Sequence, residues 1–537
     1  MHGLIMANSL AIESILSYAE KYFSSSEIVS VNPEGGITRY TYQDAAERMR
    51  RLANVLKDFG VGQQECVGTL AWNTHRHLEL YYAVSGSGAI LHTINPRLFP
   101  EQITYIVNHA EDRVLFVDRQ FIPLLESVIN ELPLVEKIVV LTDRKNMPQS
   151  ALQLLCYEEL LAAASATFHW PTNKEDSAAS LCYTSGTTGN PKGVLYSHRS
   201  TVLHALALRA PQVIGVSQAS VILPVVPMFH VNSWGVPYGA LMAGAKLVLP
   251  GSALDGESLA KLITAESADI LLGVPTVWSG LLDYCDKHKL ILDSVKDVVI
   301  GGSAASYGMI KKFHEQHNAF VIHAWGMTEL SPIGSVNSWT PQMAKMTIEE
   351  RYQAQTKQGR PVFGVEMKLI GPDDNELPHD GSSFGRLLVR GLWVASGYYK
   401  NEDNSAWVDG WFDTGDVATI DCNGIMKIVD RAKDVIKSGG EWISSIDVEN
   451  AVASYPGIRE CAVVGIPHPK WEERPLLFVV AHDNVVIDQT ELMAFLAEKI
   501  VKWWLPEAMI TLDQLPHTAT GKILKRALRD QYADHYK

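Results

Sequence analysis

Short apolar runs alternate with helical patterns over most of this chain, and that alternation limits the fold more than any other feature of the sequence. Residues 41–60, TYQDAAERMRRLANVLKDFG, place apolar side chains at helical spacing and end in glycine, as a helix and its stop signal do. Strands separated by helices favour an α/β fold with largely parallel sheets. The predicted strands are residues 65–72, 113–118, 136–143, 220–227, 246–250, 269–275 and 296–303.

The pattern changes near residue 385. Short apolar stretches with turn signals such as Asn423-Gly424 predict an antiparallel, hairpin-rich region. Residues 444–537 then have the size of a compact α+β unit. We therefore expect a large N-terminal domain over residues 1–432, made of sheets with packed helices plus a β-rich subdomain, and a small α+β C-terminal domain over residues 433–537.

The charge balance and the cysteine pattern argue against several classes of protein. The 537 residues include 46 Lys+Arg against 60 Asp+Glu, a formal charge of −14, whereas broad nucleic-acid binding needs a basic surface. The six cysteines are scattered without a CxxC spacing, so we expect buried thiols in a reducing compartment rather than disulfides or a zinc site. The N-terminus lacks a signal-peptide pattern, because Glu13, Glu20 and Lys21 interrupt its apolar residues. These features predict a cytoplasmic protein.

One long stretch, residues 210–245, contains no Asp, Glu, Lys or Arg. It nevertheless includes His230, Asn232 and four prolines, which a membrane helix tolerates poorly. We interpret the stretch as buried core and pocket wall, and expect no membrane span.

Residues 183–193, YTSGTTGNPKG, carry the motif that indicates a chemical function. Glycines allow backbone N–H groups to turn toward an anion, hydroxyls donate further hydrogen bonds, and a lysine adds a point charge. The expected ligand is a polyphosphate. The loop is not a Walker A motif, which needs glycine just before lysine, where this chain has Pro191.

Further motifs follow in the order found in the adenylate-forming superfamily, which the chain resembles from about residue 40 to about residue 530. That superfamily groups acyl-CoA synthetases, luciferases and the adenylation domains of peptide synthetases. The strongest resemblance is to stand-alone acyl-CoA synthetases, of the medium-chain and 3-(methylthio)propanoate ligase type, through His230, Trp234 and residues 437–444, KSGGEWIS. The other motifs are MFHVN (228–232), GGSA (301–304), AWGMTE (324–329), WFDTGD (411–416), DRAKD (430–434) and TATGK (518–522).

The resemblance implies a reaction in two steps. A carboxylate attacks the α-phosphate of Mg·ATP to give acyl-AMP and diphosphate, and the thiol of coenzyme A then displaces AMP to give an acyl-CoA. Glu329 and the hydroxyl of Thr184 are expected to hold Mg²⁺, because a hard cation prefers oxygen ligands. Trp325 is expected to stack on adenine, where the family more commonly has Tyr, and Asp416 to accept the ribose hydroxyls. The residues expected to bind ATP or AMP are Thr184, Ser185, Gly186, Thr187, Thr188, Gly189, Lys192, Gly302, Ser303, Ala304, His323, Ala324, Trp325, Gly326, Met327, Thr328, Asp416 and Arg431.

Lys522 is the expected catalytic residue of the first step, because a positioned ammonium stabilises negative charge that develops on the α-phosphate. It lies in the same small domain as the segment expected to line the coenzyme A channel. The resemblance therefore implies that this domain rotates about Lys433 between the two steps. Catalytic roles are expected for Lys522, His230 and Glu329, and coenzyme A contacts for Lys437, Gly439, Gly440, Glu441 and Trp442.

The charge-free stretch is expected to form an apolar pocket for the acyl chain. His230 is expected to contact the substrate carboxylate or the adenylate, and Trp234 resembles a gating indole of fatty-acyl members. No acidic residue occupies this wall, which argues against an amino-acid substrate, because its ammonium would need a buried carboxylate. Arg386 stands where family members commonly have Glu, and the sequence gives no functional interpretation of it. The expected pocket residues are His230, Val231, Trp234 and Gly302.

The leading hypothesis is an ATP-dependent acyl-CoA ligase that uses ATP, Mg²⁺ and coenzyme A and acts on a medium-chain fatty acid or 3-(methylthio)propanoate. Short aromatic acids also fit an apolar pocket. The alternatives are an enzyme that adenylates an amino acid or an aryl acid, a luciferase-like oxygenase, and a non-catalytic regulator that binds ATP or an acyl group. The intact Lys192, Glu329 and Lys522 argue against the regulator. No nucleic-acid partner is expected, and a homodimer is expected from the resemblance alone.

Overall fold

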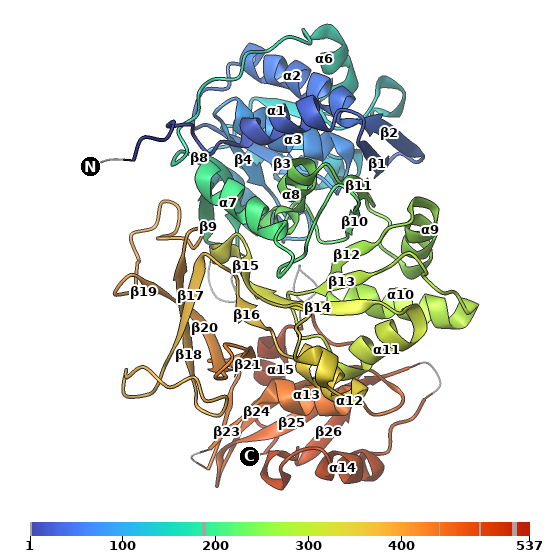
Figure 1. Ribbon diagram of the computed structural model, residues 1–537, viewed down its shortest axis with the longest axis vertical. Helices are drawn as coiled ribbons and strands as arrows, with labels where there is room; N and C mark the ends of the chain where they lie inside the picture. The colour runs from blue at the N-terminus through green and yellow to red at the C-terminus, as the bar shows by residue number, and fades with distance from the viewer. Residues whose placement is uncertain (1–2, 185–189, 440, 483–484, 518–522, 537) are drawn as a thin grey trace.

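The computed structural model describes residues 3–184, 190–439, 441–482, 485–517 and 523–536 (Figure 1). Residues 27–361 contain two large sheets. In the described part of the chain one sheet has nine strands, parallel in the middle and antiparallel at the edges. Its strand order is β16 (Arg360–Pro361), β15 (Ile333–Asn337), β14 (Phe320–Gly326), β13 (Asp297–Ile300), β12 (Ile270–Gly273), β10 (Val221–Pro224), β11 (Lys246–Leu249), β1 (Glu27–Val31) and β2 (Ile37–Thr41).

The second large sheet has seven strands within the described residues, and all its pairs are parallel except the last, β8 with β9. Its strand order is β7 (Leu154–Cys156), β6 (Lys137–Val140), β5 (Val114–Val117), β3 (Cys66–Leu70), β4 (Ile90–Thr93), β8 (Ala178–Tyr183) and β9 (Gly193–Ser197). The prediction of an α/β fold with largely parallel sheets is confirmed. Each of the strands predicted from the sequence is present, and each ends earlier than predicted, because the chain turns into a loop at the carboxyl end of the strand.

Both large sheets are buried on two faces, so alternate residues of one strand enter different cores. Ile270 and Leu272 of β12 join the core between the two sheets, whereas Leu271 joins a second core on the opposite face. Phe116 and Leu115 of β5 are separated in the same way. Burial on both faces is why these strands appear in the sequence as continuous apolar runs.

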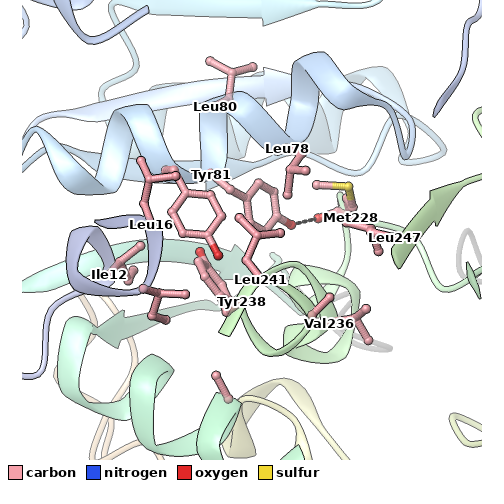
Figure 2. Packing of buried hydrophobic residues seen from close by; sticks show 14 of the residues in the cluster. Ile12, Leu16, Leu78, Leu80, Tyr81, Met228, Val236, Tyr238, Leu241 and Leu247 are labelled. Atoms are coloured by element: carbon pink, nitrogen blue, oxygen red, sulfur yellow. Dashed lines mark hydrogen bonds between the residues drawn. The ribbon is translucent and has the colours of Figure 1, made fainter. Parts of the chain in front are cut away.

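Helices fill the space between the sheets and cover their outer faces. Figure 2 shows the central core, where Leu16, Tyr81 and Tyr238 from three helices pack together and the Tyr81 hydroxyl donates to the carbonyl of Met228. The helices that contribute to this core are α1 (Ile12–Tyr22), α2 (Tyr42–Asp58), α3 (His75–Gly86), α6 (Tyr157–Ala163), α7 (His198–Leu208) and α8 (Val236–Ala243). Outside the seven-stranded sheet lie α4 (Pro100–Ala110) and α5 (Ile122–Val128), and outside the nine-stranded sheet α9 (Gly256–Glu266), α10 (Pro275–His288), α11 (Tyr307–His317) and α12 (Ile348–Gln355).

The helix predicted over residues 41–60 is α2, and its ends follow from local chemistry. The Thr41 side chain accepts from the backbone N–H of Asp44, and the Asp44 carboxylate accepts from the backbone N–H of Thr41, a reciprocal cap at the N-terminus. Gly60 follows the last turn with φ +74°, a conformation that costs glycine little.

A separate antiparallel sheet with its own core forms the predicted β-rich subdomain, seen in gold beside the large sheets in Figure 1. Its strands are β17 (Val365–Ile370), β18 (Phe384–Gly391), β19 (Trp407–Val408), β20 (Trp411–Ile420) and β21 (Met426–Arg431). β20 pairs with β21 so that Asp416 lies opposite Arg431, which brings two of the sequence motifs together.

The C-terminal domain, orange and red in Figure 1, contains a further sheet flanked by helices. Its two apolar cores contain residues from Ile436 onward and none from the large sheets in the described part of the chain. Its elements are β22 (Ile436–Ser438), β23 (Glu441–Ile443), α13 (Ser445–Ala453), β24 (Ile458–His468), β25 (Glu472–Ala481), α14 (Gln489–Ala497), β26 (Ala508–Thr511) and α15 (Lys525–Gln531).

Two expectations about the chain as a whole concern membranes and cysteines. None of the helices in the described ranges combines the length and the apolarity that a bilayer-spanning segment needs. The six cysteines are free thiols, and all are buried except Cys422, as expected for a chain without a disulfide framework.

Candidate active site

A cavity with a volume of about 1130 Å³ lies at the carboxyl ends of parallel strands of the nine-stranded sheet. This is where open α/β sheets bind their ligands, because loops of several neighbouring strands meet there. The C-terminal domain closes one side of the cavity with residues 523–526 and Arg529. The loops from the sheet that line it are Val225–Pro227 after β10, Val274–Val277 after β12, Gly301–Ala304 after β13 and Met327–Glu329 after β14.

The phosphate-loop motif leaves the seven-stranded sheet between two antiparallel strands, β8 and β9. Its two ends are joined: the N–H of Thr184 donates to the carbonyl of Lys192 (2.9 Å), and the N–H of Lys192 donates to Oγ1 of Thr184 (3.4 Å). Thr184 lines the cavity, and Nζ of Lys192 lies 4.7 Å from the centre of the Tyr398 ring. Ser185, Gly186, Thr187, Thr188 and Gly189, which the sequence assigns to ATP, lie outside the described residues.

Glu329 lies in the cavity wall and is only 5% exposed. The Tyr398 hydroxyl donates to its Oε1 (2.7 Å). Burial raises the pKa of Glu329, and the hydrogen bond from Tyr398 opposes that rise.

These residues fit a Mg²⁺ ion that arrives with a nucleotide. Mg²⁺ commonly takes one or two protein oxygens and completes its shell with phosphates and water. Glu329 offers such an oxygen, and the hydroxyl of Thr184 lines the same cavity. Within the described ranges no group of three His, Cys, Asp or Glu side chains could hold a metal by itself, so the phosphates would have to supply the remaining ligands.

Trp325, Asp416 and Arg431 form one hydrogen-bonded unit at the edge of the cavity. Nε1 of Trp325 donates to Oδ2 of Asp416 (2.9 Å), and Nε of Arg431 pairs with the other carboxylate oxygen (2.9 Å). Arg431 also donates to the carbonyl of Thr414 (3.3 Å). Asp416 is 3% exposed, so its charge is held by these two partners. The indole bond lies in the ring plane, which leaves the face of Trp325 available for stacking.

The glycine-rich GGSA motif brings the backbone close to the ligand space. Gly302 has φ +77° and, with Ser303 and Ala304, lines the cavity next to Ala324, Gly326, Met327 and Thr328. His323 is 1% exposed and is not among the described lining residues, and its Nε2 accepts from the N–H of Ala305 (3.3 Å). Burial lowers the pKa of His323 to about 4.

The wall expected to hold the acyl chain contains a left-handed turn. Val231, Asn232, Ser233 and Trp234 have φ between 46° and 55°, and Gly235 follows at 75°. Left-handed conformations cost non-glycine residues roughly 1–2 kcal/mol each, and a run of four is unusual. His230, Val231 and Trp234 line the cavity, and the Trp234 ring covers Gly301, where an added Cβ would lie 3.0 Å from Cη2 of the indole.

Polar side chains hold this turn from below. The Ser233 hydroxyl donates to the carbonyl of Val226 (2.8 Å). The carboxamide of Asn232 donates to Ser180 (2.9 Å) and accepts from Cys182 (3.2 Å), both on β8. Gly235 lies against His204, whose Nδ1 would be 2.6 Å from an added Cβ.

The C-terminal domain contributes described residues next to one of its two motifs to the cavity wall. Residues 523–526, which follow the predicted catalytic Lys522, line it, whereas Lys437 and Gly439 are not among the described lining residues. Lys433 also lines the cavity, and its carbonyl accepts from Arg529 (3.1 Å). Lys522 and Gly440 lie outside the described residues, as do the side chains of Glu441 and Trp442.

Two contributions to the cavity, from Tyr398 and Arg97, could not be found from the motifs. Tyr398 contacts both Glu329 and Lys192, which are far from it in the chain. Arg97 lines the cavity with its guanidinium between the rings of Trp72 and Phe229, at 5.4 and 5.8 Å from their centres. The sequence places these residues in loops, and a place in a loop does not predict which distant side chain a residue contacts.

Arg386, which the sequence left without an interpretation, has a structural role. It pairs with Asp413 (2.7 Å) of the WFDTGD motif and with Asp374 (2.7 Å). A glutamate at this position could not make either pair, because it would carry the same charge as the two aspartates.

Two sequence profiles match the chain. The AMP-binding enzyme profile matches residues 19–399, and the profile of the AMP-binding enzyme C-terminal domain matches residues 447–522. Together they cover the large sheets, the cavity loops and most of the C-terminal domain.

Characterised relatives are similar over nearly the whole length. The chain is 49% identical to a 3-methylmercaptopropionyl-CoA ligase of Ruegeria lacuscaerulensis, with 99% of both chains covered. It is 47% identical to a medium-chain-fatty-acid–CoA ligase of Ectopseudomonas oleovorans, with 99% of this chain and 98% of the relative covered. Among solved structures, an anthranilate CoA ligase in complex with anthranoyl-AMP superposes with a TM-score of 0.88 at 25% identity, with 98% of each chain covered. The chain therefore belongs to the AMP-binding enzyme family, the adenylate-forming enzymes that its motifs resemble.

Proposed function

We propose that this protein is an ATP-dependent acyl-CoA ligase that converts an acid with an apolar tail, ATP and coenzyme A into acyl-CoA, AMP and diphosphate by way of acyl-AMP. One observation carries the proposal: a single cavity joins the end of the phosphate loop, at Thr184, to an apolar chamber. The chamber's side chains include Ile214, Val231, Trp234 and Val336. An acid bound there has its carboxyl group within the cavity that also receives the nucleotide.

In the first step the residues act mainly by positioning and by balancing charge. The phosphate loop and Lys192 hold the β- and γ-phosphates, Glu329 and Thr184 hold Mg²⁺, and Trp325, Asp416 and Arg431 bind the nucleoside. Lys522 stabilises the charge that develops as the carboxylate oxygen bonds to the α-phosphorus and diphosphate leaves. His230 contacts the carboxylate or the adenylate.

In the second step the thiol of coenzyme A attacks the acyl carbonyl, and AMP leaves. We propose a domain boundary between residues 432 and 433, so that rotation about Lys433 exchanges the Lys522 segment for the hairpin that carries Lys437, Gly439, Gly440, Glu441 and Trp442. Support comes from residues 523–526, which line the cavity in this structure. The first matched profile ends before this boundary, at residue 399, and the second begins after it, at residue 447.

The proposed substrates are medium-chain fatty acids and 3-(methylthio)propanoate, the acids of the two named relatives. Both have unbranched, uncharged tails, and a thioether packs among apolar side chains much as a methylene does. We also propose a cytoplasmic location, from the free buried cysteines, and a homodimer, from the resemblance alone.

Acid-dependent exchange of labelled diphosphate into ATP tests the first step, and acyl-CoA formation tests the whole reaction. Medium-chain acids and 3-(methylthio)propanoate should support both, whereas amino acids should support neither. Lys522→Ala should abolish exchange and spare thioesterification of supplied acyl-AMP. If none of the acids in the panel supports exchange, the proposed function is wrong.

A further inference from the structure

The left-handed turn at residues 231–235 is attached to the strand that leads into the phosphate loop. Asn232 lies in the middle of the turn and is 3% exposed. Its side chain points away from the cavity residues beside it and into the seven-stranded sheet, where it meets Ser180 and Cys182. Both partners are fully buried in β8, the strand that ends one residue before Thr184.

The carboxamide has a hydrogen-bond partner at its nitrogen and another at its oxygen. Nδ2 of Asn232 donates to Oγ of Ser180 (2.9 Å), and Oδ1 accepts from Sγ of Cys182 (3.2 Å). Buried polar groups that are fully paired specify one arrangement of the elements they join, because every alternative leaves a group unpaired. The two elements joined here are the wall of the acid chamber and the base of the phosphate loop.

The left-handed turn places two apolar side chains in the cavity wall. Val231 and Trp234 flank Asn232 and Ser233 in the chain and both line the cavity, while the two polar side chains are buried beneath it. With a right-handed or extended backbone at residue 232, the polar side chains would turn toward the cavity and the apolar ones away from it. The position of the apolar wall therefore depends on keeping the turn left-handed, and Asn is among the few non-glycine residues that tolerate this conformation.

We propose that Asn232 is a positioning residue that fixes the acid chamber relative to β8, the strand that ends next to Thr184. This inference rests on the proposed function, because it takes the chamber as the acid site and the loop as the ATP site. Through Asn232, a displacement of the turn displaces β8, so the affinities for acid and for ATP change together when the carboxamide is lost.

Four variants separate the backbone, the turn and the link to β8. Asn232→Gly keeps a residue that accepts φ near +50° and removes only the carboxamide. Ser180→Ala removes the partner on β8 without touching the turn. Ser233→Ala is the matched control, since it removes the Ser233 bond to Val226 and leaves the link to β8 intact. Cys182→Ser keeps a donor to Asn232 and should behave as the unmodified enzyme does.

The measurement is the initial rate of acid-dependent ATP–diphosphate exchange, with acid and ATP varied in turn and thermal unfolding recorded for each variant. Asn232→Gly and Ser180→Ala should each raise both KM values at least fivefold, whereas Ser233→Ala should raise the KM for the acid alone. A residue that merely supports the fold would lower the unfolding temperature and leave both KM values unchanged, and that result would overturn the proposal.

The outcomes also separate this proposal from the proposed function. If Asn232→Gly does not fold, Ser180→Ala decides, and a KM for ATP equal to that of the unmodified enzyme refutes the link. The link is also refuted if Ser180→Ala and Ser233→Ala change the KM values for acid and for ATP in the same way. Absence of exchange in the unmodified enzyme would instead count against the function itself.

Discussion

At the residue scale, the cavity depends on charged groups that are held by partners distant in the chain. Glu329 is buried, and its carboxylate is steadied by a hydroxyl from Tyr398, whose ring also lies beneath Lys192. A carboxylate that holds a metal must be ionised, yet burial raises the pKa of Glu329. Tyr398 therefore sets how far the pH can fall before the proposed metal ligand becomes protonated.

Tyr398→Phe should move the acid limb of the rate profile to higher pH. The substitution removes a hydrogen bond that lowers the pKa of Glu329 and keeps the ring under Lys192. The Glu329 carboxylate is ionised above its pKa and becomes protonated as the pH falls through that value. Because the variant raises the pKa of Glu329 further, its carboxylate becomes protonated at a higher pH. The test is kcat/KM for ATP against pH between about 5 and 8. An unchanged acid limb would show that Glu329 does not control it.

Trp325→Phe should raise the KM for ATP while preserving the aromatic face. It removes the indole donor to Asp416, which then relies on Arg431. A hydrogen bond to a charged group contributes about 1.5–3 kcal/mol, and about 1.4 kcal/mol is tenfold in affinity. We expect a roughly tenfold increase. Trp339→Phe, at a half-exposed tryptophan outside the cavity lining, is the control and should leave KM unchanged.

At the element scale, the left-handed turn shows tertiary contacts overriding local preference. Val and Trp have no intrinsic tendency to adopt positive φ, and a β-branched residue there is a genuine outlier. The strain is offset by buried hydrogen bonds from Asn232 and Ser233 and by close packing at Gly235. Strain of this kind persists where the surroundings fix it, commonly beside a ligand.

Gly235→Ala should destabilise the protein by roughly 2 kcal/mol or more, because the new Cβ combines positive φ with a clash. That atom would lie 2.6 Å from His204 on a backbone at φ 75°. Gly308→Ala is the matched control: it lies in α11 with no atom within 4 Å of the new Cβ, and should be stabilising by roughly 0.5–1 kcal/mol. Urea unfolding of both variants checks the prediction. A neutral Gly235→Ala would mean that the turn relaxes.

The sequence predicts the elements of this fold better than it predicts their contacts. The strands were predictable because burial on both faces leaves continuous apolar runs such as residues 269–275. The motifs predicted the cavity loops, and the family and fold class are confirmed. His323 was assigned to the nucleotide from its place beside AWGMTE, and in the structure it is 1% exposed with its Nε2 bonded to the backbone of Ala305, a contact that no local pattern indicates. The contacts of Tyr398 and Asn232 join distant segments, so no local pattern could indicate them.

At the scale of the whole molecule, three contacts join the last strand of the subdomain to the start of α13 in the C-terminal domain. Lys427 pairs with Asp447 (2.8 Å), the Ser444 hydroxyl donates to the carbonyl of Val429 (2.6 Å), and the N–H of Ser445 donates to Asp430 (2.7 Å). These contacts span the proposed pivot at Lys433. A rotation there must change them, so they favour the orientation seen here, with residues 523–526 at the cavity.

Lys427→Glu should slow adenylate formation relative to thioesterification of supplied acyl-AMP. The new charge repels Asp447 and weakens the present orientation, and because the pair is partly exposed the shift should be modest, about 0.5–1 kcal/mol or two- to fivefold. The ratio of the two half-reaction rates is the measurement. Lys427→Arg should retain the ratio of the unmodified enzyme, and Lys261→Glu, on the exposed face of α9, should leave it unchanged. Equal slowing of both steps would argue against an effect on orientation.

The two apolar cores of the C-terminal domain include no described residue from the large sheets, and every side chain proposed to touch the acyl tail precedes residue 433. The proposed function therefore assigns the choice of acid to residues before the pivot and the change between the two steps to the C-terminal domain. A chimera that joins residues 1–432 of this chain to the C-terminal domain of a distant homologue should therefore keep the substrate preference of this chain and take its turnover rate from the homologue.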